Sequence, residues 1–192
     1  MAEIARSPRL LLRMLAPTDR GEIVAMHEAG NDIERWLPPL TPGTSFDQMI
    51  DHWLSDDPTR HVRLVAERTG EDGPRLASIV NLTDIIRGVF QNAFIGWRTH
   101  PKLTGRGYCT ESVRLALQFA FAHDGLQLHR VQAAILPDNL ASCRVAEKCG
   151  FRLEGVAQRY LLIRDQWRTH LLYGITSEET VPSSPVPTPN IE

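Results

Sequence analysis

Apolar residues recur along this chain with helical spacing in some segments and in alternation in others, and this difference separates the expected helices from the expected strands. In residues 46–54 the apolar side chains return every three or four positions, as on one face of an amphipathic helix. Ser45 and Gln48 have capping-box spacing at the start of that helix, and Asp19 and Glu22 have the same spacing in an earlier segment. The sequence therefore predicts two helices together with their first turns.

Alternating or continuous apolar segments, bounded by turn residues, predict the strands. Three strands joined by short turns imply antiparallel pairing, whereas later strand–helix–strand units permit parallel neighbours. We therefore expect an α/β fold with a mixed sheet and helices packed against it. The expected strands are residues 9–15, 61–68, 75–85, 91–99, 129–136, 151–163 and 167–175. Two further helices are expected, one that begins near Cys109 and one over residues 138–150.

One domain is the economical arrangement for 192 residues, because a chain of this length can bury a substantial core. The composition changes after Thr176, where four prolines occur among the last sixteen residues and large apolar groups are almost absent. We therefore expect a folded domain over residues 1–176 and a disordered tail over residues 177–192.

Composition narrows the class of function. With 42% hydrophobic residues, 23% charged residues and a net charge of −2, the chain has no basic footprint for nucleic acid. The leucine run at residues 10–12 is too short for a signal-peptide core or a membrane span, so we expect a cytoplasmic protein without a membrane partner. The three cysteines form no paired framework and the seven histidines lack metal-ligand spacing, so we expect reduced thiols and no metal.

Two glycines one residue apart mark the most informative stretch. Gly105 and Gly107 lie between a strand ending near Thr99 and a helix beginning near Cys109. Glycines at a helix N-terminus let backbone N–H groups surround a pyrophosphate, although a tight turn would explain them as well. The chain contains neither a P-loop nor the dinucleotide-binding glycine pattern, so a different phosphate-bearing cofactor is implied.

Several motifs in fixed order carry a family resemblance. Residues 102–107, KLTGRG, resemble the pyrophosphate loop of GNAT-fold N-acetyltransferases, with Lys102 where Gln or Arg is usual. The order of a strand, P-x-N-x-x-S, a short helix and G-F-x-x-E-G in residues 129–155 resembles the ribosomal-protein (RimJ/RimL) group. The central strands and the last hairpin extend this likeness over about residues 8–176. It looks closest to the RimJ type, which acetylates the N-terminal alanine of a small-subunit ribosomal protein.

The resemblance implies a single GNAT-fold domain, with a mostly antiparallel sheet of six to seven strands and about four flanking helices. It implies an acyltransferase that uses acetyl-coenzyme A (acetyl-CoA) and transfers acetyl to a primary amine by direct attack. The expected acceptor is the N-terminal α-amine of a ribosomal or other protein. Two alternatives stay open: a small amine such as an antibiotic or an aminoacyl metabolite, and a non-catalytic module that binds CoA. The protein is expected to be a monomer or a homodimer.

The resemblance also assigns residues to the cofactor. Backbone N–H groups near residues 95–98 would face the thioester carbonyl. Asn139 would contact the cofactor arm and Ser142 would protonate the thiolate, although Asn139 also suits a helix N-cap and Ser142 the first turn. Many GNAT enzymes have a tyrosine where this chain has Ala146. The expected cofactor-binding residues are Ile95, Trp97, Arg98, Lys102, Leu103, Thr104, Gly105, Arg106, Gly107, Tyr108, Asn139 and Ser142.

The general base is not assigned by the resemblance, because the glutamate of some relatives aligns with Leu161. Tyr160, next to Leu161, is the second catalytic candidate besides Ser142, although a phenol of pKa about 10 is a poor base at neutral pH. An α-amine is roughly a tenth neutral at pH 7, so it needs a base less than lysine does. The other open candidates are Asp84, His100 and Glu111, of which Glu111 suits a structural role.

Acceptor contacts are expected from the loop of Trp36, Leu37 and Pro38 and from Trp167 in the final hairpin. Core packing is the alternative for the tryptophans, and we prefer it for Trp53. Cys109 stands at a helix N-terminus, which can lower the pKa of a thiol. It lacks a His–Asp pattern, so we expect no acyl-cysteine intermediate.

Overall fold

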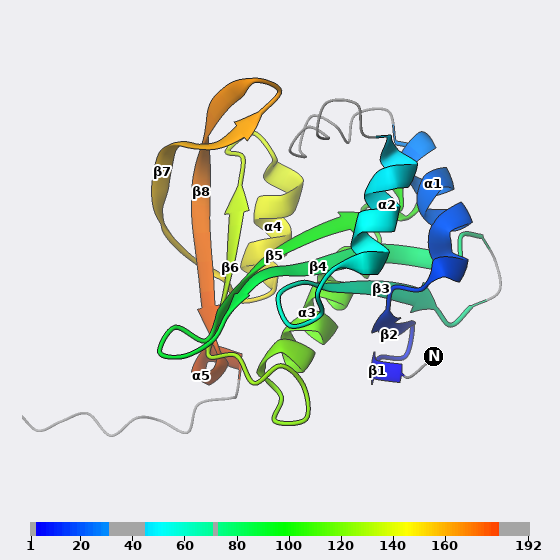
Figure 1. Cartoon of the computed structure of the whole chain (residues 1–192), viewed down its shortest axis with the longest axis horizontal. Coiled ribbons are helices and arrows are strands. Elements are labelled where there is room, and N and C mark those ends of the chain that lie inside the picture. Colours follow the sequence, from blue (N-terminus) through cyan, green and yellow to red (C-terminus); the bar gives the residue numbers. More distant parts are fainter. Residues whose placement is uncertain (1–2, 31–44, 71–72, 181–192) are drawn as a thin grey trace, which may run out of the picture.

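The computed structural model describes residues 3–30, 45–70 and 73–180, and Figure 1 shows them as one sheet with helices on both faces. The elements, in chain order, are β1 (Glu3–Arg6), β2 (Leu10–Met14), η1 (Pro17–Asp19), α1 (Arg20–Glu28), α2 (Phe46–Ser55), β3 (Val62–Arg68), β4 (Leu76–Ile86), β5 (Asn92–Thr99), η3 (Pro101–Leu103), α3 (Tyr108–Phe121), β6 (Arg130–Ile135), α4 (Leu140–Lys148), β7 (Arg152–Ile163), β8 (Gln166–Thr176) and α5 (Ser177–Thr180).

The sheet has eight strands in the order β1-β2-β3-β4-β5-β6-β8-β7. Every neighbouring pair in the described chain is antiparallel except β5 and β6. The expected mixed, mostly antiparallel sheet is therefore confirmed. The eight strands of the described sheet exceed the upper expected number, seven, by one, because the short β1 extends the sheet beyond β2.

Opposite faces of the sheet bury different helices. Leu64, Ala66 and Val80 point into the larger core, which α3 and α4 cover. The alternate residues Val65 and Ile79 point into a second core beneath α1 and α2. Because successive strand residues face opposite sides, the near-continuous apolar pattern of β3 and β4 is what a sheet covered on both faces requires.

β5 and β6 are paired only at their first residues and then diverge. They pair at three positions, from Asn92 with Arg130 to Phe94 with Gln132. β5 then stays paired with β4 up to Thr99, while β6 stays paired with β8 up to Ile135. Figure 1 shows the two strands diverging, with α4 beside the open end. One edge of β5 therefore lacks a strand partner over residues 95–99 within the described chain.

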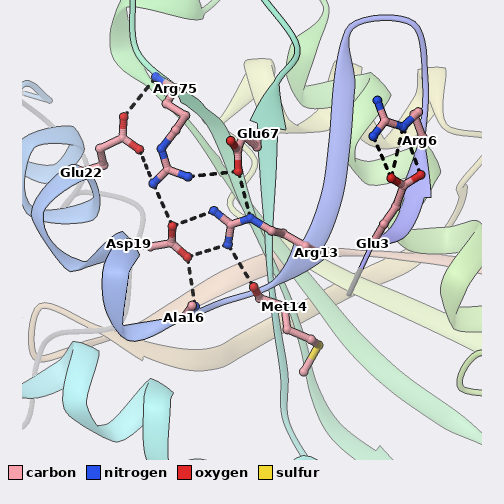
Figure 2. A network of polar contacts seen from close by, with 9 residues as sticks. All are labelled: Glu3, Arg6, Arg13, Met14, Ala16, Asp19, Glu22, Glu67 and Arg75. Carbon is pink, nitrogen blue, oxygen red and sulfur yellow. Dashed lines mark hydrogen bonds and ion pairs between the residues drawn. The ribbon is translucent and has the colours of Figure 1, made fainter. Parts of the chain in front are cut away.

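A network of charged side chains joins the first strands to α1 (Figure 2). Arg13 is 3% exposed and Asp19 is fully buried, and two hydrogen bonds of 2.7 Å connect them. Arg75 donates to Asp19 at 2.9 Å, and both arginines donate to Glu67. Burial alone would raise the pKa of Asp19, but the hydrogen bonds from the two arginines and the Ala16 N–H hold that pKa below 3.8.

The two predicted capping boxes have different outcomes. At α2 the prediction is confirmed, because Gln48 N–H donates to Ser45 Oγ at 3.1 Å and Ser45 N–H donates to Gln48 Oε1 at 2.7 Å. At α1 it is wrong: Asp19 makes no side-chain cap bond to that helix. The Asp19 carboxylate is instead occupied by Arg13, Arg75 and the Ala16 N–H, which are stronger or closer donors.

The last described residues form a short helix. Residues 177–180, which the sequence assigned to the tail, form α5. Glu178 Oε1 lies 3.1 Å from His129 Nε2, and Glu179 pairs with Arg152 of β7. Basic residues of the domain therefore hold these acidic side chains in place, while residues 181–192 lie outside the described part. Within the described residues, no helix has the length and apolarity to cross a membrane.

Candidate active site

A cavity of about 610 Å³ lies where β5 and β6 diverge. Residues 95–99 of β5 form one wall and residues 133–136 form the facing wall. The loop before α3, the start of α4 and the β7–β8 hairpin close the remaining sides. Among the described residues that line it there is no carboxylate, whereas Arg144 and Lys148 of α4 supply positive charge.

The glycine loop forms one end of the cavity. Gly105 and Gly107 have φ angles of +74° and +82°, a conformation that other residues rarely adopt. A Cβ on Gly105 would meet no atom within 4 Å, so the backbone there is open rather than crowded. Gly107 is the N-cap residue of α3, and no side chain of the described residues caps this helix. The first N–H groups of α3 therefore lack a side-chain acceptor at the positive end of the helix dipole.

The unpaired edge of β5 forms the middle of the cavity. The predicted residues Ile95, Trp97 and Arg98 all line it. The Arg98 guanidinium lies on the other face of the sheet, where it donates to Met26 O at 3.1 Å, and burial lowers the pKa of Arg98 to about 10. Arg98 thus serves the C-terminal turn of α1 with its side chain. The wall at this position is formed by its backbone.

At the start of α4, Asn139 and Ser142 both line the cavity. Asn139 Oδ1 accepts the Ser142 N–H at 3.2 Å, so the N-cap interpretation of Asn139 is confirmed. This cap fixes the first turn and places Ser142 at the cavity wall. Within the described chain, no hydrogen bond is recorded for the Ser142 hydroxyl.

Only some of the other predicted residues line the cavity. Leu103 and Thr104 do, but Lys102 lines a smaller cavity of about 320 Å³ with Glu22 and His100. Tyr108 packs beneath Arg9, whose guanidinium lies 4.6 Å from the ring centroid. The remaining predicted residues outside the cavity wall are Arg106, an exposed loop residue, Tyr160 and Trp167, which is 62% exposed.

Residues 36–38, with the expected acceptor contacts Trp36, Leu37 and Pro38, lie outside the described part of the chain. Trp53 packs against the second core, as preferred from the sequence. Its ring lies edge-on to Phe46 at 6.3 Å, and the Arg63 guanidinium lies 5.6 Å from its centroid.

Three candidates for the general base are occupied or distant. His100 Nδ1 accepts the Lys102 N–H at 3.2 Å, so the buried imidazole caps η3 at the start of the glycine loop. Glu111 binds Ser7 and Arg9, which agrees with a structural role. Asp84 is exposed at an irregularity of β4, with a φ angle of +50°, and does not line the cavity.

His170 is the residue that the sequence interpretation missed. It is 3% exposed and lines the cavity from β8, and Leu161 of β7 lines the same cavity. The Nδ1 atom lies 3.0 Å from Arg168 O, and the Tyr160 ring contacts the imidazole edge-to-face at 6.0 Å. Burial lowers the pKa of His170 below 6.5, with opposing effects from the backbone and side chain of Arg168. No short motif in the sequence marks this histidine, because the strand register decides where it points.

Cys109 also lines the cavity, but not as a reactive thiolate. Burial raises the pKa of its thiol to about 11, and a hydrogen bond with Thr99 offsets only part of that rise. The helix N-terminus does not outweigh the loss of solvation here.

The cavity fits a long, anionic thioester cofactor on these observations. Open N–H groups at the glycine loop suit phosphate oxygens, and a strand edge without a partner offers backbone donors and acceptors to an extended chain. The basic α4 side chains complement the negative charge.

Comparison with known proteins gives the same picture. The acetyltransferase (GNAT) domain family matches residues 9–152. Over 105 residues the chain is 43% identical to the Bacillus subtilis protein named "Probable N-acetyltransferase YjcK", covering 55% of this chain and 57% of that one. Over 111 residues it is 30% identical to the Escherichia coli ribosomal protein uS5-alanine N-acetyltransferase, covering 58% and 56%. These alignments span little more than half the length of each relative.

Among solved structures, Mycobacterium smegmatis RimJ in complex with CoA-disulfide superimposes with a TM-score of 0.73 at 26% identity. The superposition covers 91% of this chain and 84% of that one. Since the family match covers well over half of the residues, the chain belongs to the GNAT acetyltransferase family.

Proposed function

We propose that this protein transfers acetyl from acetyl-CoA to a primary amine, most specifically to the N-terminal α-amine of a protein such as a ribosomal protein. The observation that carries the proposal is the cavity between β5 and β6, which joins an open glycine cradle, an unpaired strand edge and Ser142. The family and the two relatives named above support the reaction class.

Each wall has a role in this proposal. The first N–H groups of α3 bind phosphate oxygens, and the free edge of β5 holds the cofactor arm and offers hydrogen bonds to the acyl oxygen. When bound, acetyl-CoA supplies an acetyl group activated as a thioester. The reaction forms a C–N bond and breaks a C–S bond, so one proton leaves the amine and one reaches the thiolate. The Ser142 hydroxyl is the donor on the wall for that second proton.

The charges around the cavity favour an α-amine over a polycation as the acceptor. The described lining has no carboxylate to hold extra ammonium groups. A protein N-terminus has a pKa near 8 and is roughly a tenth neutral at pH 7, whereas a lysine amine is almost fully charged. Direct attack by the amine agrees with the raised pKa of the Cys109 thiol.

Thiol release from acetyl-CoA tests the proposal. One set of acceptors has free N-terminal Ala, Ser or Thr, and a matched set has a blocked N-terminus and an internal lysine. Aminoglycosides and polyamines run in parallel. We expect turnover confined to the free N-termini. Turnover with small amines alone would replace the proposed acceptor, and binding of acetyl-CoA without any turnover would indicate a non-catalytic module.

Replacing Ser142 tests the proton donor. We expect Ser142→Ala to lower kcat by roughly 10²- to 10⁴-fold, the usual contribution of a general acid, with the Kd for acetyl-CoA unchanged. Ser55→Ala is the control, because Ser55 is exposed at the end of α2, far along the chain from the cavity residues. Wild-type kcat in Ser142→Ala would remove this role.

A further inference from the structure

We propose that Nε2 of His170 accepts the proton that the attacking amine loses. This inference rests on the proposed acetyl transfer and adds the general base that the sequence left unassigned, because Leu161 cannot take a proton. It follows from the tautomer that the backbone imposes, from the place of His170 in the cavity wall and from the chemistry of its neighbours.

The backbone fixes the tautomer. His170 Nδ1 lies 3.0 Å from Arg168 O. A carbonyl oxygen can only accept a hydrogen bond, so Nδ1 must carry the hydrogen in this contact. In a neutral imidazole the other nitrogen, Nε2, is then the unprotonated acceptor. Among the described residues no hydrogen bond to Nε2 is recorded, so its lone pair is left to the cavity.

The sheet register places His170 opposite the start of α4. The next residue, Leu171, pairs with Ile135, the last residue of β6. The chain then passes through Asn139 into α4, where Ser142 lines the same cavity. His170 and Ser142 therefore approach the cavity from different elements at the same end of β6. Such an arrangement separates the group that takes a proton from the group that gives one.

The neighbours leave His170 as the suitable base. Leu161 is aliphatic, and Tyr160 uses its ring to pack against the imidazole. Burial keeps His170 neutral at pH 7, the form that a base requires. The Arg168 side chain is held by Asp138 at 3.7 Å, so part of its charge is balanced. Among the described residues, the titratable and charged groups around the cavity are Tyr160 of β7, Arg168 of β8, Asp138 before α4, Arg144 and Lys148 of α4, Cys109 of α3 and Arg98 of β5, whose guanidinium lies on the other face of the sheet.

The proton balance is complete with these two groups. A neutral amine forms the C–N bond and its excess proton passes to His170 Nε2, giving an imidazolium. The C–S bond breaks and the thiolate takes the Ser142 proton. Solvent then carries the proton from the imidazolium back to Ser142, so that both residues end as they began.

Replacing His170 by asparagine is the sharpest test. The Asn side-chain N–H can keep the bond to Arg168 O, while the atom equivalent to Nε2 is lost. We expect kcat/KM at pH 7 to fall by roughly 10²- to 10⁴-fold with the acetyl-CoA Kd unchanged. The deficit shrinks toward pH 9, where solvent removes the proton more readily, and added imidazole restores part of the activity of His170→Ala. His129→Asn is the matched control, because His129 is exposed and pairs with Glu178 outside the cavity.

The outcomes separate this inference from the proposed function. Wild-type kcat/KM and an unchanged pH profile in a folded His170→Asn would overturn the role of His170 while acetyl transfer stands. Nitrogen NMR of the wild-type imidazole is a second test that needs no variant, and an Nε2–H tautomer at pH 7.5 would also overturn it. An inactive wild type on every amine would remove the proposed function, and the role of His170 with it.

Discussion

The charged network beneath α1 and the cavity between β5 and β6 treat buried polar groups in opposite ways. In the network each carboxylate and guanidinium meets a partner from the chain itself, and Asp19 alone accepts from Arg13, Arg75 and the Ala16 N–H. In the cavity the α3 N-terminus, the β5 edge and the Ser142 hydroxyl are left without such partners in the described chain. The first arrangement holds strands and helix together, whereas the second is prepared for something that the chain does not contain.

The largest expected effect comes from breaking the network. Asp19→Asn removes a buried carboxylate and leaves Arg13, which is 3% exposed, without its main partner. We expect the free energy of unfolding to fall by about 3–5 kcal/mol, as measured by urea denaturation. Figure 2 also shows the surface pair of Glu3 and Arg6, and Glu3→Gln should leave stability unchanged. Equal effects of the two variants would contradict the structural role of the network.

Gly105→Ala should weaken cofactor binding in the cavity and leave the charged network intact. The positive φ angle costs about 1–2 kcal/mol for a residue with a Cβ, and the added methyl enters the space beside the glycine loop. We expect a lower Tm and a higher Kd for acetyl-CoA by calorimetry. Gly21→Ala in α1 is the control, since its Cβ also meets open space but the site is helical; it should stabilise the protein by about 0.4–1 kcal/mol and leave the Kd unchanged.

Two helix caps allow a matched comparison. Asn139→Ala and Ser45→Ala each remove one side-chain acceptor at a helix N-terminus and should each cost about 1 kcal/mol of stability. Asn139→Ala alone should also lower kcat, because it loosens the turn that carries Ser142. Thermal unfolding and thiol release measured on both variants test this difference. A cap that served only stability would give the two variants the same activity.

Lowering the pH should reduce stability in both regions at different pH values, and this is the smallest expected effect. The pKa values of His170 and His100 are lowered by burial, so below pH 6.5 the unfolded chain binds more protons and stability falls. Asp19 has a lowered pKa, so its contribution is complete above pH 3.8 and disappears as the pH falls through the pKa of the folded state. We therefore expect Tm to decline in two steps, one below pH 6.5 and one below pH 3.8. A first step that is smaller in His170→Asn than in the wild type would assign part of it to the cavity, and the remainder would belong to His100.

Local patterns in the sequence were enough for most of the fold. The α2 capping box is confirmed because both of its partners lie within one turn. Asp19 has the same spacing, but its outcome depended on Arg13 and Arg75, and Arg75 lies 56 residues away along the chain. A charged donor brought by the sheet outweighs a local N–H group, and no local pattern contains that information.

The site shows the same limit. The glycine loop was predictable because its residues are consecutive and positive φ angles favour glycine. The position of His170 depends on strand register. β7 bulges between Ala157 and Leu161, where Arg159 has a φ angle of +50°, and this brings Tyr160 against the imidazole. A single residue of slip would turn these side chains to the other face.

The short pairing of β5 with β6 has a mechanical consequence. Three residue pairs join β1–β5 to β6–β8 across the sheet, and beyond them no strand pairing joins the two halves in the described part of the chain. A molecule bound along the gap would contact both halves of the sheet and connect them. Its binding free energy would then oppose their separation, in addition to the buried core that α3 and α4 share with both halves.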